Sequence, residues 1–484
     1  MLKFVKSHLK LPLIAIIILA LVSSISSGLI TSTYRITHGI THTNIQDNER
    51  FNDDSLNTNI NILEIDSTNR NIEVVVTAPN HSASGLELLL DQAYRLIAQD
   101  RRVVGAINGD MYAGTDDFGV IQGMPSCLTI IDGEIITSHQ DLLGAQRLPL
   151  FAIDYNGNPH ITYLFLHITA NRIRDEIPWQ LNIDFFNRNY LLAPWHTVLF
   201  TPRIAGDNTI RLLDANDHEL GVENVDDWEF AVVELEDGNG KITAGITFRG
   251  EIVYIASDVE YFKVPDNSVV IAGHNLRRLR NVNTGDIIEF TPNIYKTPED
   301  IRDLGEPVNH FNQVIGTYNW IVRDGVALTD YDFIDEGHPP MDWIVTSQTA
   351  RTGIGIREDG SIIAVTVDQV FGHVQGMTME EFGQLFYELG AVNAVNFDGG
   401  SSTEMLAYHN RDGLITVNTP TGLDPRTIST GLLFVTNSNN VTGIGHDPLN
   451  SIIIWSLVGA TVVISLVLVG HVIAKSLRKK KHEK

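Results

Sequence analysis

A strand, a helix and a second strand follow one another between residues 361 and 397, and this order leaves few arrangements open. SIIAVTV (361–367) and AVNAVNF (391–397) are predicted as the strands. The helix between them, TMEEFGQLFYELG (378–390), opens with a capping box formed by Thr378 and Glu381 and closes on Gly390 as its C′ residue. A connection of this length predicts a right-handed crossover, which makes the two strands parallel within one sheet.

Polar clusters follow the predicted strands where their carboxyl ends would lie. Asp368 comes directly after the first strand, and Asp398-Gly399-Gly400-Ser401-Ser402-Thr403 comes after the second. A third cluster, Asn108-Gly109-Asp110, follows a strand predicted at 103–107, which itself follows a helix predicted at 85–100. Ligand sites of open α/β sheets lie at such strand ends, so we expect a functional site here.

Each cluster alone has a simpler interpretation as a turn, because Asp-Gly and Asn-Gly are common turn formers. The run 398–403 is more specific, since successive glycines let the backbone approach a ligand and their N–H groups can form an anion nest. It lacks the Gly-Lys-Ser ending of a P-loop and the spacing of a nucleophile elbow.

Strand-like runs dominate the middle of the chain, so the predicted fold class is α+β or mixed α/β, a sheet-rich domain containing the crossover unit. Asp-Gly and Asn-Gly turn signals separate several strands, at 132–133, 156–157 and 324–325. The predicted strands outside the crossover unit are 60–65, 72–77, 103–107, 128–131, 230–235, 252–256, 269–272 and 287–290.

The two ends of the chain are basic and apolar. The net charge is −25, residues 1–10 carry +3 and residues 475–484 carry +5, so the stretch between them carries −33. The run 452–474 has 23 residues without a charge and predicts a membrane-spanning helix, although a buried core helix is the alternative. The front run predicts either a cleaved signal peptide or an uncleaved anchor.

These features give the predicted domain organisation and location. We expect an N-terminal signal peptide or anchor at 1–30, a linker at 31–58, the main domain at 59–436, a second linker at 437–451, a transmembrane helix at 452–474 and a cytoplasmic tail at 475–484. Transmembrane helices would therefore flank an extracellular domain anchored to the cell membrane. The single Cys127 excludes a disulfide framework and favours a bacterial surface. The acidic charge argues against nucleic acid as a partner, and the sequence leaves the oligomeric state open.

Three stretches resemble the phosphodiester glycosidase family: GAINGDMYAG (105–114), RTGIGIREDGSIIAVTVDQ (351–369) and GMTMEEFGQLFYELGAVNAVNFDGGSSTEM (376–405). Weaker similarity covers 186–202, 264–290 and 312–325. The resemblance implies hydrolysis of the bond between a sugar's anomeric carbon and a phosphodiester oxygen, with a sugar phosphodiester or cell-envelope glycan as substrate. The motif positions that match are Asn108, Gly109, Arg351, Asp368, Asn396, Asp398, Gly399, Gly400, Ser402 and Thr403.

The sequence also departs from the family pattern. Ser401 stands at the third glycine of the hallmark, Asp110 stands where a glycine is usual, and Gln369-Val370 replace a common Gly-Arg. The loss of that arginine leaves open a rival function, a non-hydrolytic carbohydrate-binding or exopolysaccharide-assembly protein of the cell surface.

Enzymes that cleave glycosidic bonds usually use two carboxyl groups, one as nucleophile or base and one as acid. Asp398 and Asp368 are the predicted pair. Arg351, with His373 as a second candidate, would supply a cation for the phosphate. Asn108, Gly109, Asp110, Asn396 and residues 399–403 would bind substrate. Acidic loops such as Asp116-Asp117 and 332–336 permit Ca²⁺ or Mg²⁺ as an alternative source of positive charge.

Overall fold

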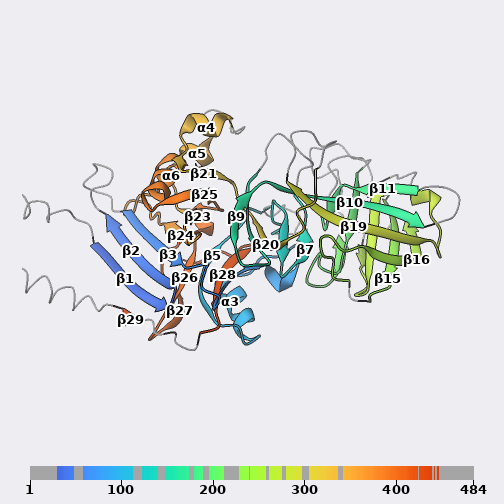
Figure 1. Ribbon diagram of the computed structural model, residues 1–484, viewed down its shortest axis with the longest axis horizontal. Helices are drawn as coiled ribbons and strands as arrows, with labels where there is room; N and C mark the ends of the chain where they lie inside the picture. The colour runs from blue at the N-terminus through green and yellow to red at the C-terminus, as the bar shows by residue number, and fades with distance from the viewer. Residues whose placement is uncertain are drawn as a thin grey trace, which may run out of the picture.

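The computed structural model describes residues 30–47, 58–112, 123–139, 148–173, 179–188, 196–211, 228–238, 240–257, 261–274, 279–296, 305–335, 342–422, 424–438, 441 and 444–445. The described strands form extended sheets, and the molecule is elongated (Figure 1). A nine-stranded sheet lies towards one end of the long axis, and an eight-stranded sheet lies at the other end. The predicted sheet-rich character is therefore correct.

The nine-stranded sheet contains the crossover unit. Its strands, in spatial order, are β22 (Val326–Ala327), β21 (Asn319–Arg323), β25 (Ala391–Asn396), β23 (Arg351–Arg357), β24 (Ile362–Val367), β3 (Thr58–Ile65), β2 (Ile40–Asp47), β1 (Ile30–Thr37) and β29 (Ile444–Gly445). Both β24 and β25 pair antiparallel with β23, which lies between them. The two strands of the unit are thus parallel to each other in one sheet, as predicted, although they are not neighbours.

Two five-stranded sheets occupy the middle of the molecule (Figure 1). The first contains, in order, β27 (Gly413–Thr416), β26 (Met405–His409), β5 (Val103–Asn108), β28 (Gly431–Thr436) and β4 (Ile72–Thr77). The second contains β7 (Glu134–Thr137), β6 (Thr129–Ile131), β20 (Phe311–Gly316), β8 (Leu150–Asp154) and β9 (Pro159–Thr162). Asp132 and Gly133 join β6 to β7 with φ of 48° and 76°, as a two-residue hairpin turn requires.

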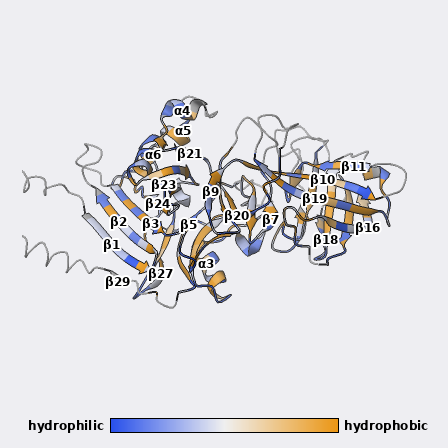
Figure 2. Cartoon of the chain, viewed as in Figure 1, coloured by the Kyte–Doolittle hydropathy of each residue, from blue (hydrophilic) through white to orange (hydrophobic). Residues whose placement is uncertain are grey.

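The eight-stranded sheet is built from residues 164–296. Its strands, in order, are β11 (Trp179–Ile183), β10 (Leu164–Ile173), β19 (Ile287–Lys296), β16 (Phe248–Ser257), β15 (Trp228–Leu235), β18 (Ser268–His274), β13 (Thr197–Phe200) and β12 (Phe185–Phe186). A separate pair joins β14 (Thr209–Arg211) to β17 (Tyr261–Lys263). Along β19 buried residues alternate with partly exposed ones, and Figure 2 shows the corresponding alternation of apolar and polar residues in this sheet.

The described helices are short and lie beside the sheets. They are α3 (Leu89–Ile97), α4 (Asp330–Asp335), α5 (Trp343–Thr346) and α6 (Met379–Glu388), with 3₁₀ turns η1 (Pro79–His81), η4 (Leu279–Asn281) and η5 (Gly400–Ser402). The capping box predicted for α6 is present: the Glu381 N–H donates to the Thr378 hydroxyl, and the Thr378 N–H donates to the Glu381 carboxylate. Gly390 follows with a φ of 85°. The first helix begins at Leu89 instead of Gly85, because Glu87 pairs with Ile428 in a β-bridge.

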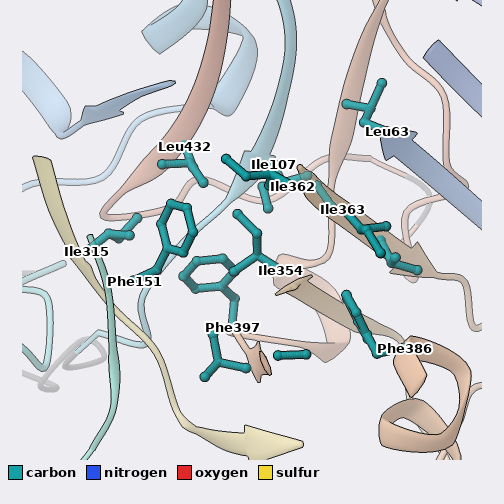
Figure 3. Packing of buried hydrophobic residues seen from close by; sticks show 14 of the residues in the cluster. Leu63, Ile107, Phe151, Ile315, Ile354, Ile362, Ile363, Phe386, Phe397 and Leu432 are labelled. Carbon is teal, nitrogen blue, oxygen red and sulfur yellow. The ribbon is translucent and has the colours of Figure 1, made fainter. Parts of the chain in front are cut away.

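The largest apolar core joins three of the sheets. Figure 3 shows Ile354 and Ile363 of the nine-stranded sheet beside Ile107 and Leu432 of the first five-stranded sheet, with Phe151 of the second close by. Each of these side chains is buried. Burial of this kind stabilises by about 25 cal/mol per Å² of apolar surface, and it fixes the strand ends that carry the polar clusters.

Residues 31–47 differ from the linker that their polar composition predicts. They form most of β1 and all of β2, and β2 pairs with β3 along its whole length. The Asn44 side chain donates to the side-chain oxygens of Asn59 and Asn61, so polar contacts along the strands accompany a few buried apolar side chains such as Ile36 and Ile40. Threonines favour strands, but the pattern lacks the apolar alternation by which strands are recognised. In the second predicted linker, β29 pairs with β1.

The predicted fold class needs one correction, because its flanking transmembrane helices are not supported. Among the residues that the structure describes, no helix is both long and apolar enough to cross a membrane. The segments on which that prediction depended, 1–29 and 452–474, lie outside the described residues.

Replacing Thr378 by alanine tests the cap of α6. The variant loses the hydroxyl that accepts from the Glu381 N–H, so we expect urea unfolding to show a loss of about 1 kcal/mol in the free energy of unfolding. The control Gln384→Ala changes an exposed position of the same helix and is expected to cost less than about 0.5 kcal/mol. Equal losses in the two variants would contradict the role of the cap.

Candidate active site

Two of the predicted strand ends meet at Asp398. The Asp398 N–H donates to the carbonyl of Gly109 at 3.0 Å, and the Asn108 side-chain amide donates to the Asp398 carbonyl at 2.7 Å. Asn108 ends β5 in a five-stranded sheet, whereas Asp398 follows β25 in the nine-stranded sheet. The clusters therefore come together by the meeting of two sheets, not along the edge of one.

Asn108 is placed to hold this junction. Its side-chain oxygen accepts from the Thr352 hydroxyl at 2.7 Å and from the Glu404 N–H at 3.0 Å. The side chain is fully buried, and these bonds use both ends of the amide. The structure thus gives Asn108 a positioning role, although substrate binding was predicted for it.

The glycines after Asp398 are required by close backbone contacts. A Cβ on Gly399 would lie 2.8 Å from the carbonyl oxygen of Ala350, and Gly400 has a φ of 57°. The Gly400 N–H donates to that same carbonyl at 2.8 Å. The N–H groups of Ser402 and Thr403 donate back to Gly399 and Gly400. Because the Gly400 N–H already has a backbone partner, it is not available to the predicted anion nest.

The Asp398 carboxyl lies in a partly buried environment beside a cation. Burial raises its pKa to about 6, while the nearby Ser402 hydroxyl and the Arg426 guanidinium act to lower it. Arg426 donates to the Ser401 hydroxyl at 3.1 Å, and its guanidinium carbon lies 5.2 Å from the centre of the Tyr112 ring. Arg426 is exposed, so this cation can reach a ligand that approaches Asp398.

Sequence reasoning did not select Arg426. It stands in the loop TGLDPRT (421–427), away from any predicted strand end and without a pattern around it. The Asp424-Pro425 dipeptide before it signals only a turn.

Asp110 provides a second carboxyl in the same neighbourhood. Burial raises its pKa to about 7, and the charge of Asp398 adds to that rise, whereas the Cys127 N–H and Arg188 lower it. One carboxyl oxygen accepts from the Cys127 N–H at 2.8 Å, and the other is buried without a hydrogen-bond partner among the described residues. Two carboxyls that influence each other are the arrangement that separates acid and base roles.

The eight-stranded sheet contributes a further cation. Arg188 lies just after β12, is almost fully buried and donates through Nε to the Ser138 carbonyl at 2.9 Å. Its charge lowers the pKa of Asp110, and together with burial it lowers the pKa of His139 to about 4. His139 is therefore neutral beside this arginine. No pattern around Arg188 marks it as functional beyond its place in the weakly similar stretch 186–202.

Asp368 lies elsewhere than predicted. One of its oxygens accepts from the Asn59 side chain at 2.6 Å and from the Thr419 N–H at 2.8 Å. The side chain is fully buried, and burial raises its pKa to about 6. These contacts anchor the start of the loop that leads to Arg426. The Asp368 carboxyl thus bonds to Asn59 and Thr419, and its predicted partnership with Asp398 gains no support.

Two of the remaining candidates, Arg351 and Asn396, donate to backbone carbonyls. The Arg351 guanidinium is buried and donates to the carbonyls of Met377 at 2.8 Å and Ser347 at 2.7 Å, and burial lowers its pKa to about 10. The Asn396 amide donates to the Phe397 carbonyl at 2.6 Å. His373 is exposed in the turn 370–374. Ser402 and Thr403 are buried at the end of the loop that Asp398 begins.

Metal binding by acidic loops stays a prediction. Among the residues that the structure describes, no group of three or more His, Cys, Asp or Glu side chains is placed to hold an ion. Asp116, Asp117 and Glu336, which belong to the predicted acidic loops, lie outside those residues.

A pair of carboxyls that influence each other is an arrangement that glycosidases use. Residues 242–435 match the phosphodiester glycosidase family, which confirms both the resemblance seen in the sequence and the predicted enzyme class. The matched range contains Arg351, Asp368, Asp398 and Arg426, whereas Asn108 to Asp110 precede it. Among curated proteins, none matches the chain in sequence.

Solved structures share the fold at low sequence identity. A hypothetical protein from Synechocystis is 17% identical with a TM-score of 0.60, and the match covers 84% of this chain and 64% of that protein. A candidate exported protein from Burkholderia pseudomallei is 17% identical with a TM-score of 0.60, covering 78% of this chain and 74% of that one. The chain thus spans 64% of the length of the Synechocystis protein.

The third similar structure is the catalytic domain of zebrafish N-acetylglucosamine-1-phosphodiester alpha-N-acetylglucosaminidase, auto-inhibited by its pro-peptide. It is 16% identical, with 85% of each chain covered and a TM-score of 0.38. That score is too low for the comparison to bear on the fold.

Replacing Arg351 or Arg426 by methionine tests which of the two arginines contributes to stability. Arg351→Met leaves the carbonyls of Met377 and Ser347 without this donor, and we expect a loss of about 2 kcal/mol in the free energy of unfolding. Arg426→Met changes an exposed side chain and is expected to stay within about 0.5 kcal/mol of the wild type. Chemical denaturation of both variants measures the difference, and a larger loss for Arg426→Met would contradict these roles.

Proposed function

We propose that the protein hydrolyses the bond between a sugar's anomeric carbon and a phosphodiester oxygen. The observation that carries the proposal is the Asp398 carboxyl, which lies within electrostatic reach of both the Arg426 cation and the Asp110 carboxyl. The family match over residues 242–435 supports the same reaction class.

The carboxyls of Asp398 and Asp110 differ in protonation near neutral pH, and the proposal therefore gives them different catalytic roles. Asp398, with a pKa of about 6, is largely ionised at pH 7, so its negative charge stabilises the oxocarbenium-like transition state at the anomeric carbon. Asp110, with a pKa of about 7, keeps its proton in much of the population. The proposal therefore assigns Asp110, in place of Asp368, as the acid partner of Asp398.

The reaction balances with water as the only added reactant. The bond between the anomeric carbon and the phosphate oxygen breaks, and its electron pair leaves with the phosphate. The water oxygen then bonds to the anomeric carbon, and its proton is lost to a carboxylate. Asp110 donates its proton to the departing phosphomonoester, which needs less protonation than a sugar alkoxide would.

Arg426 takes the role that Arg351 was predicted to have. Its guanidinium is exposed and lies beside the Asp398 loop, whereas that of Arg351 donates to two backbone carbonyls. A guanidinium can bind phosphate oxygens with two parallel hydrogen bonds and stabilise the charge that develops on the leaving group.

The substrate class and the location belong to the same proposal. A sugar phosphodiester or a cell-envelope glycan would supply both an anomeric carbon and a phosphate. A location outside the cytoplasm is supported by the Burkholderia protein of similar fold, which is described as exported.

Replacing Asp398 by asparagine tests the reaction. We expect Asp398→Asn to release free sugar from UDP-N-acetylglucosamine, or from another sugar-1-phosphodiester, at least about a hundredfold more slowly than the wild type, because the amide cannot stabilise positive charge at the anomeric carbon. The control Asp412→Asn changes an exposed carboxyl that pairs with His409 at 2.9 Å, and its rate should match the wild type.

Two results would contradict the proposal. The first is equal sugar release by the wild type and Asp398→Asn. The second is the absence of release by the wild type from every sugar phosphodiester tested, with and without Ca²⁺, which would favour the non-hydrolytic carbohydrate-binding function.

The pH dependence of kcat/KM tests the carboxyl pair. Activity needs ionised Asp398, so it should rise as the pH increases through about 6, and it needs protonated Asp110, so it should fall above about 7. The side chain in Asp110→Asn cannot titrate, so this variant should be slower and should lose the fall above about pH 7. A fall that persists unchanged in Asp110→Asn would show that another group is the acid.

A further inference from the structure

Two large aromatic side chains protrude from segments that hydrogen bonds connect to the Asp398 loop. Phe371 is 99% exposed at the tip of the turn 370–374, and Trp343 is 72% exposed at the start of α5. Tyr331 of the neighbouring helix α4 is 82% exposed, and Figure 1 shows α4 beside α5. Aromatic side chains of this size are rarely left in water, because burying one is worth about 1.5–3 kcal/mol. We call Trp343 and Phe371 the aromatic platform.

A ladder of amides joins the two parts of the platform. The turn that carries Phe371 is closed by a bridge between Val370 and Val374. On either side of it, Gln369 donates to the Gln348 carbonyl at 2.8 Å, and the Gln375 amide donates to the Gln348 side chain. Gln348 lies two residues after the end of α5. The turn and the helix are therefore held together by hydrogen bonds.

The same segment leads directly to the Asp398 loop. Thr349 forms a β-bridge with Met377, and the carbonyl of Ala350 accepts from the Gly400 N–H at 2.8 Å. Thr349 also donates to the Gln369 side chain at 3.2 Å. Residues 348–350 thus connect the Asp398 loop to the two segments that carry the platform.

We propose that the aromatic platform binds the sugar rings of a glycan chain attached to the sugar phosphodiester that is cleaved at Asp398. This inference rests on the proposed function and names the part of the substrate that lies beyond the scissile bond. The C–H faces of pyranose rings are apolar and pack on aromatic rings, while their hydroxyls are donors and acceptors for amides. Such amides flank the platform: the side-chain oxygen of Gln375 is buried and has no hydrogen-bond partner among the described residues.

The charges around the platform distinguish a glycan from a membrane surface. Asp330, Asp332 and Asp342 belong to α4 or to the N-cap of α5, and they give this region negative charge. Interfacial aromatic residues that bind anionic lipids are usually accompanied by Lys and Arg. A neutral glycan meets no electrostatic penalty here.

The test combines a binding assay with an activity assay on the full chain. In the Asp398→Asn background, titration calorimetry measures the binding of chitotetraose, cellotetraose and maltotetraose. The double variant Trp343→Ala/Phe371→Ala is compared with Tyr254→Ala, which removes a 52% exposed tyrosine from β16 in the eight-stranded sheet. In the Asp398-containing protein, sugar release from UDP-N-acetylglucosamine is measured for the same variants.

We expect at least one tetrasaccharide to bind, with a Kd that rises about tenfold in the double variant and stays within about twofold in Tyr254→Ala. Hydrolysis of the small substrate should be unchanged in the double variant, because that substrate does not reach the platform. Melting temperatures equal to the parent confirm that the variants fold.

The inference is overturned if none of the tetrasaccharides binds, or if the double variant binds them as tightly as its parent. It is also overturned if the platform instead mediates binding to phosphatidylcholine vesicles. If the wild type hydrolyses no sugar phosphodiester but tetrasaccharide binding still depends on the platform, the proposed hydrolysis fails while the glycan site stands.

Discussion

The architecture of the site depends on the hydrogen bonds that join the end of β5 to the residue after β25. The Gly109 carbonyl accepts from the Asp398 N–H, and the buried Asn108 amide bonds to Asp398, Thr352 and Glu404. Ile107 and Phe397, which precede these residues in the chain, belong to an apolar core shared by three sheets (Figure 3), so neither strand end can shift without exposing buried groups. The junction therefore holds the Asp398 carboxyl in one place.

Burial at this junction also sets the chemistry. The carboxyls of Asp398 and Asp110 are shielded from water, and this raises the pKa of each into the range where enzymes use them. The cations that oppose the rise come from different parts of the chain: Arg426 from a loop near the C-terminus and Arg188 from the eight-stranded sheet. The eight-stranded sheet thus contributes to the electrostatics of the site as well as to the size of the molecule. The aromatic platform extends the same site outward, along residues that bond directly to the Asp398 loop.

Local patterns predicted the elements with a strong sequence signal. The capping box of α6, the glycine that ends it, the strands on either side and the Asp-Gly hairpin turn each follow from contacts within a few residues. Residues 31–47 were missed because Thr and Asn side chains bond along β1 to β3 without an apolar alternation. The flanking membrane helices were predicted from composition alone, and the described residues contain no such helix.

The sequence by itself determined the crossover unit, the family resemblance and the choice of Asp398, because these depend on residues that are close along the chain. Only the tertiary structure decided which side chains surround Asp398. It directs Arg351 to backbone carbonyls and Asp368 to Asn59 and Thr419, and it brings Asp110 and Arg426 to the site from positions separated by more than 300 residues. Contacts of such long sequence separation leave no local pattern, since they form only when separate sheets pack on a common core.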